Sequence, residues 1–107
     1  MSGARWRILV RELADAGVDV TLDEYAYSED RYGRVHHGVT RSITLRLADG
    51  GLLGVHDKWA RFNADIWLGW QVHTENADGI TTRSWPFTKD RRDVIAAAVE
   101  AKVAQVA

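Results

Sequence analysis

The side chains that could carry chemistry in this chain are four histidines and five tryptophans. His36 and His37 are adjacent, whereas His56 and His73 lie in separate segments. These spacings match neither a helical i, i+4 pair nor another ligand spacing typical of zinc sites. The chain has no cysteine, which excludes thiolate metal sites and cysteine nucleophiles. We therefore predict that it binds no metal and no cofactor.

The sequence also contains no motif typical of nucleophilic catalysis or of phosphate binding. No serine lies in a Gly-x-Ser-x-Gly pattern. Gly50 and Gly51 follow a strand pattern into a turn, whereas a phosphate-binding loop opens a helix. Asp19, Asp23 and Glu24 fall on the polar side of a strand, where solvated carboxylates are ordinary. The sequence therefore predicts no catalytic residue and favours a protein that is not an enzyme.

Length and composition indicate one ordinary domain over residues 1–107. The hydrophobic fraction is 46%, and 14 basic residues nearly balance 15 acidic ones, for a net charge of −1. A dedicated nucleic-acid binder is usually more basic. No segment approaches the ~20 apolar residues of a membrane span, and charged residues interrupt the N-terminal segment. We expect a cytoplasmic protein without a membrane partner.

The spacing of apolar residues sets the elements that must position these side chains. It predicts, in chain order, a helix over 4–16, strands over 18–27, 39–48, 53–57, 64–75 and 80–85, and a helix that Thr88 caps. Gly17 is expected to end the first helix in a left-handed conformation, with Val18 folding back on it. The polar segment 28–38 is predicted to be a functional loop.

The strand over 64–75 is predicted to be central, because one of its faces is wholly apolar. Alternation places Trp70 and Val72 on that core face, with Trp67 on the opposite face. Trp85 is expected to stack near Trp70. The strand over 18–27 is expected to continue its alternation into an aromatic end at Tyr25 and Tyr27, and a bend or bulge is expected within 58–63.

The turn over 49–51 decides the register of the two strands that it joins. A three-residue turn pairs Leu47 with Leu53 and Leu45 with Val55, which keeps apolar opposite apolar. The resulting order, a helix, five antiparallel strands and a helix, predicts an α+β two-layer sandwich. Two helices cover only one face of such a sheet, so the other face is open to solvent or to a partner.

A candidate binding surface follows from these predicted faces. Its expected residues on the open face are Trp67, Trp59, Arg46, Lys58, Arg61 and His73, and those in the loop are Tyr32, Arg34, His36 and His37. Tryptophan and arginine are frequent in protein-binding hot spots. The same residue types stack and hold unpaired bases in nucleic-acid binders. A third interpretation is that the 28–38 loop covers these aromatic rings within the molecule.

Two resemblances bear on function. Gly33-Arg34-Val35-His36-His37 and Lys89-Asp90-Arg91-Arg92 resemble parts of a double-stranded-RNA-binding domain, although the loop proline of that family is missing and an extra hairpin is present. The run from Tyr27 to Gly38, with Asp57-Lys58-Trp59 and Trp67-Leu68-Gly69-Trp70-Gln71-Val72, resembles uncharacterised small accessory proteins of actinobacteriophages. Eleven arginines, three lysines and fourteen alanines suit a GC-rich genome.

The phage resemblance implies an accessory protein in the cytoplasm of a bacterial host. The leading expectation is that it binds a host protein, or itself, through the open sheet face and the 28–38 loop. The alternative is a nucleic-acid-binding module that uses the aromatic and basic side chains.

Overall fold

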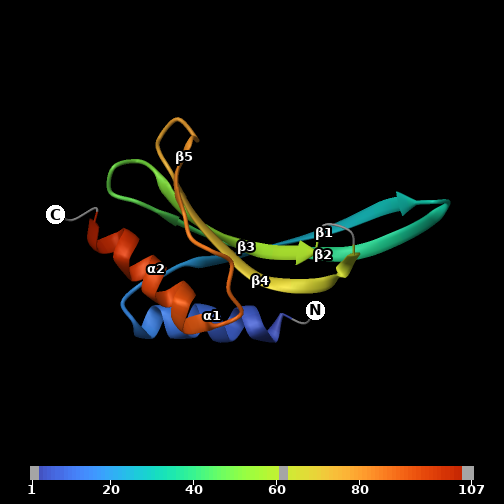
Figure 1. The fold of residues 1–107 in the computed structure, drawn as a ribbon, viewed down its shortest axis with the longest axis horizontal. Helices are drawn as coiled ribbons and strands as arrows, with labels where there is room; N and C mark the ends of the chain where they lie inside the picture. Colours follow the sequence, from blue (N-terminus) through green and yellow to red (C-terminus); the bar gives the residue numbers. More distant parts are fainter. Residues whose placement is uncertain (1–2, 61–62, 105–107) are drawn as a thin grey trace.

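The fold places two helices against one face of a curved antiparallel sheet (Figure 1). The computed structural model describes residues 3–60 and 63–104, with the backbone alone for 31, 36 and 63–65. The elements in chain order are α1 (Ala4–Asp15), β1 (Thr21–Arg31), β2 (Arg34–Arg46), β3 (Leu52–Ala60), β4 (Asn63–Glu75), β5 (Thr81–Ser84) and α2 (Arg91–Ala104). Strand order follows chain order, from β1 at one edge to β5. The predicted α+β class and layer arrangement are confirmed.

Helix α1 is held by its apolar stripe and by the predicted left-handed residue at its end. Its buried side chains are Trp6, Leu9 and Leu13. Gly17 has φ +84°, and the N–H of Val18 bonds to the carbonyl of Leu13 at 2.8 Å. The turn satisfies carbonyls that a helix end otherwise leaves unpaired. It also places Val18 in the core, as the sequence predicts.

The segment predicted to be a loop over 28–38 is instead the end of a long β-hairpin. β1 and β2 pair continuously from Thr21–Thr44 to Arg31–Arg34. Only Tyr32 and Gly33 form the turn, with φ +53° and +76°, as a type I′ turn requires. The loop prediction was wrong because both faces of this hairpin are exposed, so its sequence lacks the alternation that burial on one face imposes.

The second hairpin keeps the predicted parity with a shifted register. Leu45 pairs with Leu53 and Ile43 with Val55, two residues from the expected pairing. The backbone N–H of Leu47 donates to the carbonyl of Gly51, so the three residues of the turn are 48–50. A shift of two leaves every side chain on its predicted face, which is why apolar residues still oppose apolar residues.

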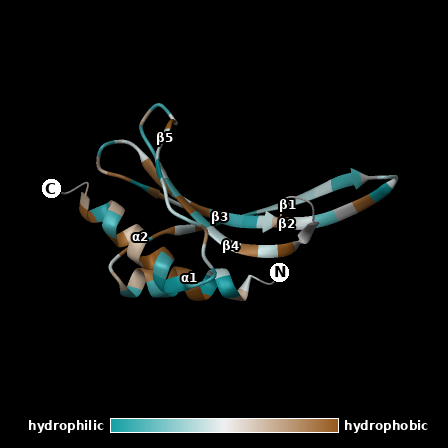
Figure 2. Ribbon diagram, in the orientation of Figure 1, coloured by the Kyte–Doolittle hydropathy of each residue, from teal (hydrophilic) through white to brown (hydrophobic). Residues whose placement is uncertain are grey.

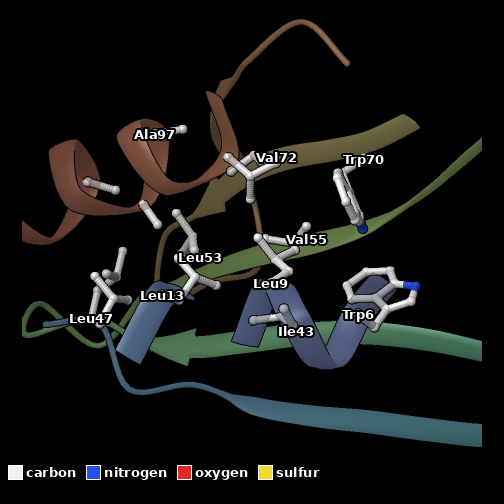
Figure 3. Close-up of a cluster of buried hydrophobic side chains, with 14 residues drawn as sticks. Trp6, Leu9, Leu13, Ile43, Leu47, Leu53, Val55, Trp70, Val72 and Ala97 are labelled. Carbon is white, nitrogen blue, oxygen red and sulfur yellow. The ribbon is translucent and has the colours of Figure 1, made fainter. Parts of the chain in front are cut away.

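The core lies between the helices and the middle of the sheet (Figure 3). Trp6 of α1 meets Trp70 of β4 edge to face, with ring centroids 6.1 Å apart. Helix α2 contributes the buried side chains of Val94, Ala97, Ala98 and Ala101. Its cap differs from the predicted Thr88, because Asp90 Oδ1 accepts the N–H of Arg92 at the first turn.

Pairing at the other edge of the sheet continues beyond β5. His73 pairs with Ser84, and farther along Thr88 makes an isolated bridge with Trp70, a short sixth segment of the sheet. Trp85 packs against the core on the predicted face. Its expected stacking on Trp70 is wrong: Trp85 lies under the guanidinium of Arg83, 4.3 Å from its ring centroid.

The β1–β2 hairpin reaches well past the helices (Figure 1). β3 pairs with β2 from Ser42 to Arg46, so no third strand among the described residues pairs with the outer part of the hairpin. The molecule measures 53 × 30 × 22 Å, and its radius of gyration is 14.9 Å, against about 13 Å for a compact domain of this size. An elongated hairpin arm therefore extends from a small core.

We expect Trp70→Ala to lower the free energy of unfolding by roughly 3–5 kcal/mol, because the ring is fully buried and its removal leaves a cavity. Phe87→Ala is the control, since Phe87 is 48% exposed and its loss should cost under about 1 kcal/mol. Urea denaturation measures both values. Equal losses in the two variants would contradict this account of the core.

Candidate binding surface

A β-bulge in β4 decides where the aromatic side chains lie. Lys58 pairs with Gly69, but Trp59 pairs with Trp67, so Leu68 is an extra residue in the ladder. An extra residue reverses the alternation beyond it. Trp67 therefore points to the helix side, and its ring meets Trp70 edge to face at 5.1 Å. The prediction of Trp67 on the open face was wrong for this reason.

Gly69 makes the bulge possible. Its φ is +132°, and a Cβ at this position would lie 2.3 Å from the carbonyl oxygen of Thr88. A side chain is excluded both by the backbone conformation and by the close approach of the next segment. The irregularity expected within 58–63 is present between Lys58 and Ala60. The face of Trp67, however, was predicted by counting alternate residues from Trp70, and that count assumes a strand without an extra residue.

Trp67 belongs to a half-buried polar cluster beside the core. Its indole N–H donates to Asp57 Oδ1 at 2.8 Å, and the guanidinium of Arg5 lies 3.9 Å from its ring centroid. Burial raises the pKa of Asp57 above its ordinary value, although interactions with the indoles of Trp67 and Trp6 partly oppose the rise. This cluster joins the start of α1 to β3 and β4, so these residues serve the fold.

The predicted aromatic and basic patch does not assemble on the open face. Trp59 pairs directly with Trp67 and shares its helix-side face. Arg46 and Lys58 are exposed on the open face, but they lie near opposite ends of the sheet, about 20 Å apart along the strands. Arg61 lies outside the described residues.

The middle of the open face carries a histidine pair instead. The rings of His56 and His73 lie 5.5 Å apart, and His73 Nε2 is 2.9 Å from Glu75 Oε2. His73 lies across Gly54, where a Cβ would stand 2.5 Å from its ring. Burial, and then the neighbouring His73, lower the pKa of His56, so the neutral imidazole is favoured there.

The predicted loop residues lie at the end of the hairpin. Tyr32 occupies the turn and is fully exposed, and Arg34 and His37 are also exposed. The side chain of His36 lies outside the described residues. These residues come together at one end of the molecule, far from His73 and Arg46, so the hairpin tip and the sheet centre form separate parts of the surface.

Sequence reasoning missed that the apolar side chains along the hairpin are exposed. Tyr25 and Tyr27 lie on the open face, opposite in parity to Leu22, while Val35 and Val39 lie on the other face. All four are exposed, and Figure 2 shows apolar bands on the outer half of β2. The signal that could have found the tyrosines is the odd spacing from Leu22 to Tyr25, which changes face on a regular strand.

Tyr27 is fixed in place by the glycine opposite it. It pairs with Gly38, and a Cβ at Gly38 would lie 2.5 Å from Tyr27 Oη. The ring therefore lies across the neighbouring strand, in the space that the glycine leaves. Tyr27 is 46% exposed, so this packing leaves part of its ring as an aromatic surface on the open face of the arm.

The described residues 3–60 and 63–104 contain neither a candidate metal site nor a candidate membrane-spanning helix. No group of three histidine, aspartate or glutamate side chains there is arranged to hold a metal ion. Neither helix has the length and apolar character needed to cross a membrane.

We expect the free energy of unfolding of the Asp57→Asn variant, relative to that of the parent, to increase as pH rises. The raised pKa of Asp57 means that the folded protein binds its proton more tightly than the unfolded chain does. Parent stability therefore falls as pH rises from the ordinary carboxyl pKa through the raised one. Asparagine keeps an acceptor for Trp67 without the charge. Urea unfolding of both proteins across the acidic range measures this, and a difference that shrinks with rising pH would contradict it.

Comparisons with known proteins identify no relative of this chain. It matches no family model, no curated protein and no solved structure. The resemblance to phage accessory proteins and to double-stranded-RNA-binding domains therefore stays a prediction.

Proposed function

We propose that this protein is a small non-enzymatic binding protein that engages a partner protein through the β1–β2 hairpin and the adjoining open sheet face. The observation that carries the proposal is the exposed apolar surface of the hairpin. Val35 and Tyr25, on its two faces, are 63% and 62% exposed. An arm that leaves such side chains in water on both faces gains from a partner that covers them.

The charges of the arm favour a protein partner over nucleic acid. Tyr25 and Tyr27 lie between Asp23 and Glu29 on the open face. Phosphates require lysine or arginine at such positions, and carboxylates repel them. The tryptophans expected to stack bases lie on the helix side. The nucleic-acid module is therefore the weaker of the two hypotheses.

The setting of this activity is proposed from the sequence alone. The resemblance of the hairpin and of β4 to actinobacteriophage accessory proteins supports a phage or prophage origin. In that setting the partner is a protein of the bacterial host, and binding takes place in the host cytoplasm.

We expect Tyr25→Ser and Val35→Ser each to weaken capture of the host protein, because each removes an exposed apolar contact. A hot-spot side chain supplies about 2 kcal/mol of binding, a change of about thirtyfold in affinity. Ile80→Ser is the matched control, since Ile80 is equally exposed, at 62%, in the turn before β5. The measurement is pull-down from nuclease-treated actinobacterial lysate, with thermal melts to verify folding.

Capture that survives both hairpin variants would contradict the proposal. Capture that disappears with nuclease, or that falls steeply as salt rises, would point to nucleic acid as the partner.

A further inference from the structure

The outer edge of β1 carries unpaired backbone groups in a regular array. Arg31 and Arg34 flank the two-residue turn, so they exchange both backbone hydrogen bonds, and pairs then alternate along the ladder. The N–H and C=O of Leu22, Glu24, Ala26, Ser28 and Asp30 consequently point away from β2. No described strand pairs with this side of β1.

Acidic side chains line this edge. β1 contains four carboxylates and one arginine. Glu24 lies 3.7 Å from Arg7 and 3.8 Å from Arg41, so its charge is balanced within the molecule. Asp23 and Glu29 flank the two tyrosines on the open face. The edge therefore combines outward-pointing backbone groups, two exposed rings and more carboxylates than arginines.

This charge pattern disfavours the symmetric pairing of two copies of β1 that is centred on Ala26. An antiparallel β1–β1 pair centred on Ala26 would place Asp23 of each copy opposite Glu29 of the other. Like charges directly opposite each other destabilise a strand pair, and charged edges are a common protection against edge-to-edge association. The edge instead complements a strand with basic side chains.

We propose that the free edge of β1 accepts an extended basic segment of a partner protein as an additional antiparallel strand. The proposal rests on the proposed function and names the chemistry of the partner. Main-chain hydrogen bonds to alternate residues hold the segment in register. Its lysine or arginine side chains lie beside Asp23 and Glu29, where they also reach the faces of Tyr25 and Tyr27.

The probe is a synthetic peptide as long as β1, with lysine alternating with threonine or valine. A matched peptide has glutamate in place of each lysine. Fluorescence anisotropy with the full chain gives both affinities, and we expect the lysine peptide to bind at least about tenfold more tightly, because opposite charges meet across the strands.

Two variants at one position test strand addition itself. Ala26→Pro removes an outward N–H that β2 does not use, and an edge strand tolerates proline at such a position. Ala26→Ser keeps the N–H. We expect the proline variant to lose about tenfold or more in peptide affinity and the serine variant to bind as the parent does.

A charge variant keeps the test decisive if Ala26→Pro does not fold. Asp23→Asn with Glu29→Gln should weaken the lysine peptide several-fold, whereas Asp19→Asn with Asp78→Asn makes the same change in net charge outside β1 and should leave affinity nearly unchanged. Equal binding of the two peptides, or equal loss in both charge variants, would overturn strand addition.

The outcomes also separate this proposal from the proposed function. Failure of the lysine peptide to bind, with host-protein capture still lost in Tyr25→Ser, would overturn the strand-addition proposal and leave the hairpin as the binding surface. Tight binding of a single-stranded oligonucleotide at β1 would overturn both proposals.

Discussion

The edge-to-face packing of Trp6, Trp70 and Trp67 is the interaction on which the rest of this structure depends. Trp6 brings α1 to the sheet, and Trp70 is the fully buried ring that both neighbours meet. Trp67 joins them only because Leu68 is an extra residue in β4. Each ring buries a large apolar area, so three rings give a 107-residue chain a stable core over a short length of sheet.

Because the core is confined to this part of the sheet, the hairpin arm depends on the hydrogen bonds between β1 and β2. From Arg34 to Arg41, β1 is the only described strand that pairs with β2, and isolated two-stranded hairpins are marginal in water. The arm compensates with a tight type I′ turn and with Tyr27 lying across Gly38. A rigid arm with exposed apolar side chains has less conformational entropy to lose on binding than a flexible loop would.

The sequence predicted those features that one-sided burial imposes. The stripe of α1, the left-handed Gly17 and the faces of β2 and β3 all follow from apolar periodicity against a single core. The two failures that changed the candidate binding surface have separate physical causes. The bulge at Leu68 reversed the face of Trp67, and it depends on a tertiary contact between Gly69 and Thr88 that no local pattern contains. The hairpin over 28–38 has no buried face, so its sequence lacks the alternation of apolar and polar residues that would indicate strands.

The central claim is that the β1–β2 hairpin is a rigid ladder whose outer edge is unpaired. Amide hydrogen exchange along β1, resolved residue by residue by NMR, tests it most directly. The account predicts slow exchange at Asp23, Tyr25 and Tyr27, whose amides bond to β2, and fast exchange at Glu24, Ala26 and Ser28 between them. Uniformly fast exchange would show a loop, and uniformly slow exchange would show an edge that is already covered; either result would contradict the account.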